Sequence, residues 1–216
     1  MELILVGPGR AGMSLGLAVT AAGHQVVAVV GRGDISRSAE RLGATVVVGD
    51  QPMPAADLLL VAVDDGAIGE VAAIVAPRAT ELRGAVHLSG AVRVAALQPF
   101  TARGMAVGAF HPLQSLPDPD RGAQALSGSA VAITASDPVL HEMLERLADD
   151  LGMKPFDLPD DRRALYHAAA SMASNAVGAS LLLAERLFGA AGVDPAVARP
   201  LVEKVVAHSF AGGAAA

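Results

Sequence analysis

Residues 2–22 read ELILVGPGRAGMSLGLAVTAA, and this stretch decides the fold of the chain. The run Glu2 to Val6 is typical of a strand, segment 7–12 of a glycine turn, and Met13 to Ala22 of a helix that ends at Gly23. A near-continuous apolar strand follows at 24–30, as expected where helices cover both faces of a parallel sheet. One strand-helix-strand unit therefore closes near residue 31.

Strand and helix patterns keep alternating after this unit. Helices are predicted at 36–42, 69–76 and 138–151, and strands at 44–48, 57–63, 85–88, 105–110, 129–134 and 154–158. Segment 117–120, Pro-Asp-Pro-Asp, is expected to be a surface loop, and Pro112 to break the strand before it. The alternation predicts an α/β fold with a Rossmann-type, doubly wound parallel sheet.

The pattern changes at Asp160. A long Ala-rich helix is predicted from Asp160 to Phe188, and Asp194-Pro195 opens another helix with an acidic cap and a first-turn proline. We therefore predict two domains: a dinucleotide-binding sheet domain at 1–159 and an all-α domain at 160–216 for substrate binding or dimerisation.

Composition excludes several function classes. The 216 residues carry 16 Lys and Arg against 22 Asp and Glu, a net charge of −6, and only 3% aromatic residues. A nucleic-acid binder that works by counterion release needs the opposite charge, and base stacking needs aromatic side chains. The chain has no Cys, which removes disulfides and thiolate ligands, and no spacing of metal ligands is evident.

Sequence features near the N-terminus and in the helical part bear on location. Glu2 and the short apolar run before Gly7 do not form a signal peptide, so we expect a cytoplasmic protein. Segment 164–184 is uncharged and long enough to span a bilayer, but its His, Ser and Asn residues make it too polar, and a buried helix is expected instead. No membrane association is predicted.

The glycine segment matches the pattern G-x-G-x-x-G. In such a turn Gly7 permits the bend, Gly9 leaves room for a pyrophosphate and Gly12 lets the helix pack close to the strand. The helix that follows offers free N–H groups to phosphates. The predicted cofactor-binding residues here are Gly7, Pro8, Gly9, Arg10, Ala11 and Gly12. The same glycines also fit a loop that only turns the chain.

The end of the second predicted strand indicates which dinucleotide is bound. NAD-binding proteins place an acidic residue about 20 residues after the glycine motif, on the ribose 2′-OH. This chain has Arg32 there, followed by Ser36 and Arg37, and a guanidinium pairs well with a 2′-phosphate. NADP(H) is therefore preferred over NAD(H). Alternatively, both arginines are solvated loop charges and Asp34 serves NAD.

Polar residues follow the other predicted strands, where ligands of open α/β sheets bind. Val63 and Asp64, with Asp65, end one strand, Ser89 and Gly90 another, and His111 a third. We predict that Val63 and Asp64 contact the cofactor and that Ser89 lies near its reactive ring. For the carboxylates and Ser89 the alternative is a turn or a helix cap, and for His111 a structural hydrogen bond.

The Ala-rich helix carries a polar stripe. His167, Ser171, Asn175 and Gly178 are spaced i, i+4, i+8 and i+11, which places them on one face of a regular helix. Polar groups on an otherwise apolar helix are costly to bury without partners, so the stripe favours a wet cleft. The alternative is a hydrogen-bonded seam at a helix or dimer interface.

These motifs together resemble a known family. The glycine turn, VAVDDGAI at 61–68, HLSGA at 87–91, FHPLQSL at 110–116 and YHAAASMASN at 166–175 resemble bacterial proteins that join a Rossmann-like domain to a helical domain of unknown function, DUF2520. That group is similar to the 6-phosphogluconate dehydrogenase-like superfamily, which includes ketopantoate reductases, pyrroline-5-carboxylate reductases and F420-dependent NADP reductases.

The resemblance implies an NADP-dependent oxidoreductase, often dimeric, whose helical domain closes the cofactor cleft. Several relatives use a Lys and an Asn one turn apart on the first helix of that domain. Asn175 matches the Asn, whereas Ser171 stands where the Lys would be, so His167 becomes the expected substitute. Family members usually continue with further helices, so the helical domain is expected to be incomplete by comparison.

The sequence therefore favours a reductase that passes hydride from NADPH to a carbonyl or imine carbon of a small substrate. The expected catalytic residues are His167 or His111 as proton donor, Asn175 and Ser171 as orienting groups, and Ser89. The small number of helices to cover the Ala-rich face predicts a homodimer. Two alternatives remain: a noncatalytic NADP(H)-binding sensor and an F420-dependent NADP reductase.

Overall fold

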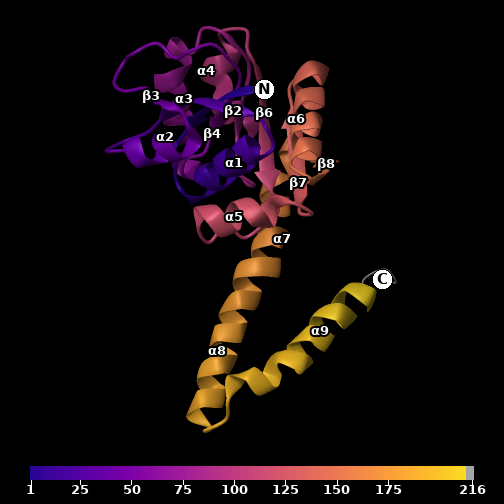
Figure 1. The fold of residues 1–216 in the computed structure, drawn as a ribbon. Coiled ribbons are helices and arrows are strands. Elements are labelled where there is room, and N and C mark those ends of the chain that lie inside the picture. Colours follow the sequence, from indigo (N-terminus) through magenta and orange to yellow (C-terminus); the bar gives the residue numbers. More distant parts are fainter. Residues whose placement is uncertain (213–216) are drawn as a thin grey trace. The chain divides into compact units, whose positions relative to one another are not determined.

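The computed structural model describes residues 1–212 and centres on one eight-stranded sheet (Figure 1). Residues 213–216, the end of the Ala-Gly-Gly-Ala-Ala-Ala tail, lie outside the described residues. The strand order is β3-β2-β1-β4-β5-β6-β7-β8. The strands are β1 (Glu2–Val6), β2 (Gln25–Val30), β3 (Thr45–Val46), β4 (Ala56–Val61), β5 (Leu82–His87), β6 (Ala106–Pro112), β7 (Ala130–Ala135) and β8 (Lys154–Asp157).

Alternate residues of the central strands face two separate hydrophobic cores. In β1, Leu3 and Leu5 pack into one core and Ile4 and Val6 into the other, and all four are almost completely buried. Because side chains alternate across a strand, a fully apolar run is what a sheet covered on both faces requires. The predicted α/β fold is confirmed.

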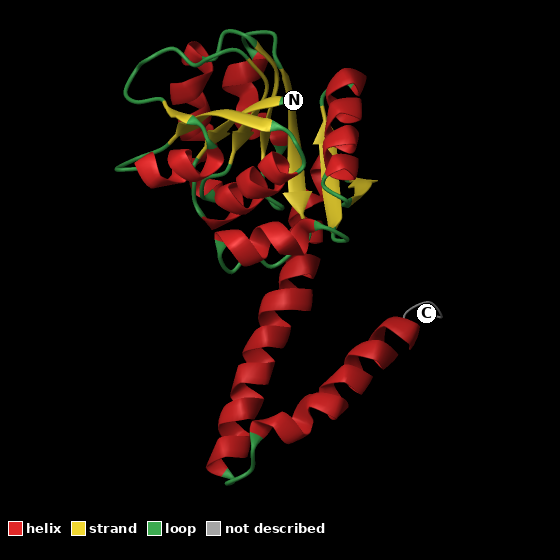
Figure 2. Cartoon of the chain, in the orientation of Figure 1, coloured by secondary structure: helices red, strands yellow, loops and turns green. Residues whose placement is uncertain are grey.

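Helices cover both faces of the sheet (Figure 2). One face packs against α1 (Arg10–Ala21), α2 (Ser36–Leu42), α5 (Pro119–Leu126) and α6 (Pro138–Asp150). The other packs against α3 (Ile68–Val75), the 3₁₀ turn η3 (Val94–Leu97) and α4 (Gln98–Thr101).

The strands are parallel except for the antiparallel pair β6 and β7. Pro112, expected to break β6, is its last residue instead. Pairing between β5 and β6 stops at Ala109, so the missing N–H of Pro112 leaves no β5 carbonyl without a donor. The prediction of a parallel sheet therefore fails only at this pair.

The segment predicted as a surface loop contains the start of a helix. Pro119 begins α5, and the Asp118 side chain caps it by accepting a hydrogen bond from the Arg121 amide at 2.9 Å. An acidic cap followed by proline is a recognised signal for a helix start, so this element was detectable in the sequence. The loop interpretation was wrong.

The chain divides into two compact units, residues 1–168 and 169–216. The domain limits 1–159 and 160–216 stay a prediction. The predicted single helix from Asp160 to Phe188 is instead a 3₁₀ turn, η4 (Asp160–Arg162), then α7 (Arg163–Ser171), a π-helical segment η5 (Met172–Ala176) and α8 (Val177–Ala190). It is followed by η6 (Pro195–Ala198) and α9 (Arg199–Gly212).

A side-chain hydrogen bond lies within the interrupted stretch. The Ser174 hydroxyl donates to Ala170 O at 2.7 Å. Between residues 1 and 212, every helix is too short or too polar to cross a bilayer.

Candidate functional site

The turn after β1 closes because two of its glycines have no room for a side chain. Gly7 has a φ of +91°, and its amide donates to Val30 O at 2.8 Å. A Cβ on Gly7 would lie 2.6 Å from Ala62 O, and a Cβ on Gly12 would collide with Gly7 O. Close contact between β1, α1 and the segment after β4 therefore requires glycine at both positions.

The third glycine of the turn, Gly9, faces open space. A Cβ on Gly9 would meet no protein atom within 4 Å. Gly9 is also the N-cap of α1, and it offers no side-chain oxygen to the first-turn N–H groups. Those amides carry the partial positive charge of a 12-residue helix, so the turn has both the space and the donors that a diphosphate needs.

A pocket of about 440 Å³ opens beside this turn. It lies at the carboxyl ends of β1, β4 and β5, where the topology of an open α/β sheet places ligands. The predicted site residues that line it are Gly9, Arg10, Ala11, Val63, Asp64 and Ser89. The sequence interpretation gave no binding role to the other lining residues, Ala62, Asp65, Leu88 and Leu116.

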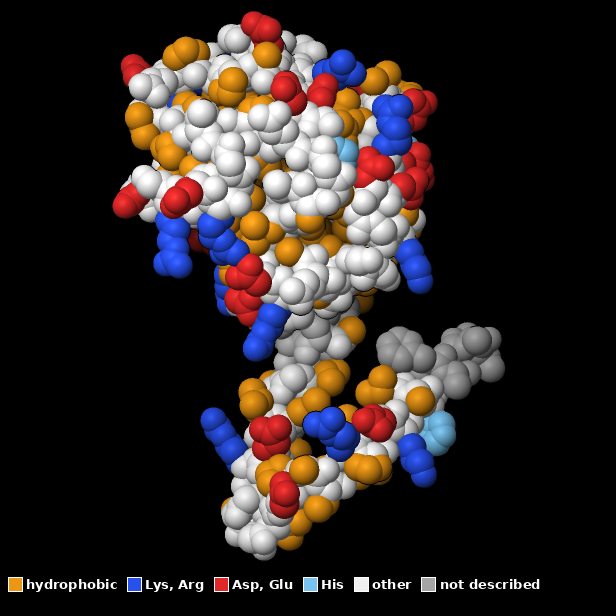
Figure 3. Space-filling model, viewed as in Figure 1, with side chains coloured by type: hydrophobic (Ala, Val, Ile, Leu, Met, Phe, Trp, Pro, Cys, Tyr) orange, Lys and Arg blue, Asp and Glu red, His pale blue; other side chains and the backbone are white. Residues whose placement is uncertain are grey.

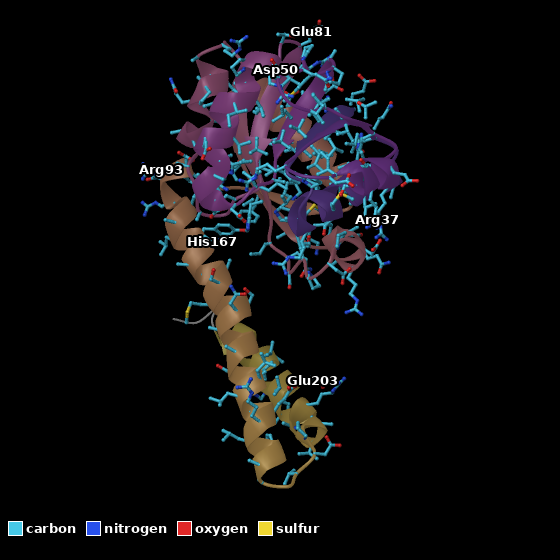
Figure 4. All side chains as sticks on the ribbon, turned by 90° about the vertical axis from the view of Figure 1, so that its left-hand side faces the viewer. Arg37, Asp50, Glu81, Arg93, His167 and Glu203 are labelled. Atoms are coloured by element: carbon cyan, nitrogen blue, oxygen red, sulfur yellow. The ribbon has the colours of Figure 1, made fainter. Side chains whose placement is uncertain are left out.

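The remaining predicted cofactor residues lie next to the pocket wall or at the end of β2. Pro8 packs on Gly31, where a Cβ would lie 2.9 Å from the Pro8 ring. Arg32, Ser36 and Arg37 are exposed, and Arg37 is marked in Figure 4. The Ser36 amide donates to the Asp34 carboxylate at 3.0 Å, and this bond lowers the pKa of Asp34. Asp34 thus serves the start of α2.

Ser89 closes the turn that follows β5. Its hydroxyl oxygen accepts hydrogen bonds from the amides of Ala91 at 3.1 Å and Val92 at 3.0 Å. The side chain is almost completely buried, although Ser89 also lines the pocket. The hydroxyl proton stays available as a donor because both of these bonds use the oxygen as acceptor.

Arg163, which the sequence interpretation did not single out, fastens the same turn from the other side. The Arg163 side chain is fully buried and donates to Val92 O at 2.8 Å, to Thr134 Oγ1 at 2.9 Å and to Ser89 O. Within residues 1–212 it pairs with no carboxylate at salt-bridge distance, and its hydrogen-bond acceptors are neutral. Burial lowers its pKa, and the nearby Asp160 opposes that shift.

Two of the predicted catalytic residues meet against Gly90. A Cβ on Gly90 would lie 2.7 Å from His167 Nδ1 and 2.8 Å from His111 Nε2, so both imidazoles crowd the same buried backbone position. The centroids of the two rings are 6.1 Å apart. Figure 4 shows His167 on α7. The structure therefore brings His111, His167 and the turn of Ser89 together at the carboxyl ends of β5 and β6.

A third histidine, His87, lies on the neighbouring strand and on the same face of the sheet as His111. His87 pairs with Ala109, two residues before His111, and side chains two apart share a face. His87 is fully buried, and neither of its ring nitrogens has a hydrogen-bond partner among the described residues. The motif HLSGA contained this residue, but its burial depends on the whole sheet.

Burial makes two of these histidines neutral at physiological pH. It lowers the pKa of His87 to about 4 and that of His111 to about 4, and the charge of Arg163 adds to both effects. A neutral imidazole has one N–H donor and one acceptor nitrogen. If His111 is the proton donor, it therefore starts from the neutral ring.

The other predicted catalytic residues belong to the second unit. Ser171 ends α7 and is half-buried, and Asn175 is exposed within η5. The stripe from His167 to Gly178 assumed 3.6 residues per turn, whereas η5 has π-helical hydrogen bonding. A regular stripe is thus not maintained through η5.

Family models match two parts of the chain. The model of a Rossmann-like domain matches residues 1–112, and that of the domain of unknown function DUF2520 matches residues 129–216. A search of curated proteins finds no match.

Solved structures of similar fold cover nearly all of the chain. A protein assigned as an NADP oxidoreductase from Bacteroides fragilis is 21% identical, with a TM-score of 0.80 over 97% of this chain and 80% of its own. A protein from Thermotoga maritima is 22% identical, with a TM-score of 0.70 over 97% and 78%. A pyrroline carboxylate reductase from Plasmodium falciparum with NADP bound is 11% identical, with a TM-score of 0.72 over 100% and 79%.

Proposed function

This chain belongs to the Rossmann-like domain family, and from that premise we propose that it is an oxidoreductase that uses NADP(H) to reduce a carbonyl or imine carbon of a small substrate. The observation that carries the proposal is the uncapped start of α1 beside the 440 Å³ pocket. Amide donors, space at Gly9 and the position at the strand ends all favour a dinucleotide diphosphate. The names of two similar structures, which include NADP, support the choice of cofactor.

Different residues would bind different parts of the dinucleotide. The amides of Gly9, Arg10 and Ala11 would hold the diphosphate, and Arg32 with Arg37 would pair with a 2′-phosphate at the end of β2. Val63, Asp64 and Ser89 would line the path toward the reactive end. When bound, the nicotinamide supplies the hydride.

The histidines supply the proton chemistry of this proposal. His111 and His167 lie next to the Ser89 turn, within the same compact unit as the pocket. Either imidazole can donate an N–H to the oxygen or nitrogen of the substrate as charge develops on it. Asn175 and Ser171 stay proposed orienting groups from the helical unit.

Calorimetric titration with NADPH and NADH tests the binding proposal. We expect heat and saturation with NADPH, followed by NADPH oxidation with a member of a panel of keto acids and cyclic imines. If neither NADPH nor NADH binds, both the proposed cofactor and the proposed reductase function are refuted. Binding with no turnover across the panel would favour the sensor hypothesis instead.

Replacing Arg32 by Asp tests the preference for NADP(H). The acidic side chain removes a partner of the 2′-phosphate and repels it, so the Kd for NADPH should rise about 10-fold or more while that for NADH changes little. Arg146→Asp is the matched control, because Arg146 is an exposed residue of α6 and its replacement changes the net charge by the same amount. An equal loss for both dinucleotides would rule out the role of Arg32 in recognising the 2′-phosphate.

A further inference from the structure

Tyr166 is joined to the histidine pair by a hydrogen bond. The distance between Tyr166 Oη and His111 Nδ1 is 2.9 Å, and the two rings are nearly perpendicular, at 89°. Phe156 packs edge-on against Tyr166 with ring centroids 5.9 Å apart, which restricts the phenol ring. Tyr166 and His111 are both half-buried, so part of the Tyr166 side chain is open to solvent.

The protonation states of the two groups are set by their surroundings. Burial raises the pKa of Tyr166, so the hydroxyl keeps its proton at neutral pH. Burial lowers the pKa of His111 to about 4, with Arg163 and His167 adding to the effect and Asp65 opposing it. At pH 7 the doubly protonated form of His111 is therefore a small minority.

The space beside Gly90 indicates which nitrogen of His111 carries the proton. His167 Nδ1 is buried there and has no hydrogen-bond partner among the described residues. His111 Nε2 and His167 Nδ1 both lie within 3 Å of the Cβ position of Gly90. A proton on His111 Nε2 puts a donor beside the same backbone position as that nitrogen, and it leaves His111 Nδ1 to accept from the Tyr166 hydroxyl.

We propose that Tyr166 and His111 form a proton relay between solvent and the reacting atom of the substrate. The proposal rests on the reductase function. The His111 Nε2–H bond breaks as the substrate oxygen or nitrogen gains that proton, and a new Nδ1–H bond forms with the proton of the Tyr166 hydroxyl. Solvent water returns a proton to the Tyr166 oxygen, so both side chains end neutral and one solvent proton is consumed.

The relay explains how a neutral imidazole can act as an acid without becoming an anion. If His111 gave up its only proton without gaining another, a buried imidazolate anion would remain, and desolvation makes that anion costly. A hydroxyl on Nδ1 removes this cost because one proton arrives as the other leaves. Tyr166 is therefore a positioning and relay residue, and His111 is the group that contacts the substrate.

The protonation pattern can be measured without any ligand. In ¹⁵N NMR spectra of the free protein at pH 7, we expect His111 to show an unprotonated Nδ1 that accepts a hydrogen bond and a protonated Nε2. In Tyr166→Phe, which keeps the ring and loses the hydroxyl, the Nδ1 signal should move toward that of a nitrogen without a donor. A proton on His111 Nδ1 in the wild-type protein would overturn the relay.

The pH profile of turnover gives the second measurement. Tyr166→Phe should lower turnover at pH 7 by about 10- to 100-fold with an unchanged Kd for NADPH. The loss should shrink toward pH 5, because the growing imidazolium population can donate without a second proton. Phe156→Leu is the control, since it loosens the phenol ring but leaves the hydroxyl in place.

The outcomes separate the relay from the function on which it rests. Equal turnover of Tyr166→Phe and wild type at pH 7, or a loss that is the same at every pH, would refute the relay while the reductase stands. Failure of the wild-type protein to bind NADPH would refute the reductase, and with it the relay to a substrate. The NMR result would then show whether the tautomer itself was inferred correctly.

Discussion

At the scale of single residues, burial of His87 destabilises the folded state by an amount that depends on pH. Its imidazole is fully buried at the end of β5, the strand between β4 and β6, and neither ring nitrogen is hydrogen-bonded within the described part of the chain. Burial lowers the pKa of His87 to about 4, below the value of about 6.5 expected in the unfolded chain. Between these two values the unfolded state binds more protons than the folded state.

The free energy of unfolding should therefore fall as the pH drops from about 6.5 toward 4. In His87→Leu this pH-dependent contribution disappears. Between pH 7 and pH 4.5 the free energy of unfolding of the variant should therefore fall by about 2–3 kcal/mol less than that of wild type. Urea unfolding followed by circular dichroism at the two pH values measures the difference. His208→Leu, a change at an exposed residue of α9, is the control and should behave like wild type.

Single residues also differ in how far the sequence reveals them. The glycine turn was predictable because its geometry is local: Gly7, Gly9 and Gly12 act within one strand-to-helix connection. Arg163 and Tyr166 were not, because their partners come from segments far apart in the chain. A lone Arg at the start of a helix looks like an ordinary surface charge until the turn after β5 encloses it.

At the scale of elements, the strands were the most predictable part of the fold. All eight overlap the ranges predicted for them, and α2 has the predicted bounds, Ser36–Leu42. The errors have physical causes: a strand end beyond the β5 pairing that tolerates Pro112, a capped helix hidden in Pro-Asp-Pro-Asp, and a π-helical segment within the Ala-rich helix. Such features depend on hydrogen bonds that hydrophobic periodicity does not report.

Among the contacts between elements, those of Arg163 should contribute most to the free energy of unfolding. Its guanidinium joins the start of α7 to β7 and to the turn after β5, through three acceptors. Arg163→Met keeps much of the side-chain volume but leaves those acceptors without donors in a buried site. We expect the free energy of unfolding at pH 7 to drop by about 2–4 kcal/mol.

Arg162→Met provides the comparison, because Arg162 is the exposed neighbour in η4 and loses the same charge. Denaturant melts of the two variants should differ by most of that 2–4 kcal/mol. If they unfold at the same urea concentration, the buried hydrogen bonds of Arg163 contribute nothing net to stability.

At the scale of the whole molecule, the described part of the helical unit has no core of its own. From residue 169 to residue 209, where side-chain exposure is described, no residue is fully buried. The helix predicted to be buried at 164–184 is mostly exposed instead. Hydrophobic side chains lie along α8 and α9 in Figure 3, and these two helices diverge from the turn between them (Figure 1).

Exposed apolar side chains in such number favour association, and we expect the partner to be a second copy of the same chain. Leu183 and Leu187 lie one helical turn apart on α8 and are 58% and 62% exposed. Burying a Leu side chain contributes about 1.5–3 kcal/mol, so a few such residues from each copy can hold a dimer together. Two identical helical units would then supply the core that one lacks.

We expect light scattering after gel filtration to give the mass of a homodimer for the wild-type protein. The double change Leu183→Gln and Leu187→Gln should shift the mass toward that of the 21.7 kDa monomer. Val139→Gln, at a 65% exposed residue of α6 in the sheet domain, should leave the dimer intact and thereby control for a loss of surface hydrophobicity alone. A wild-type monomer at micromolar concentration would contradict the pairing, because the exposed leucines would then remain in water without any partner.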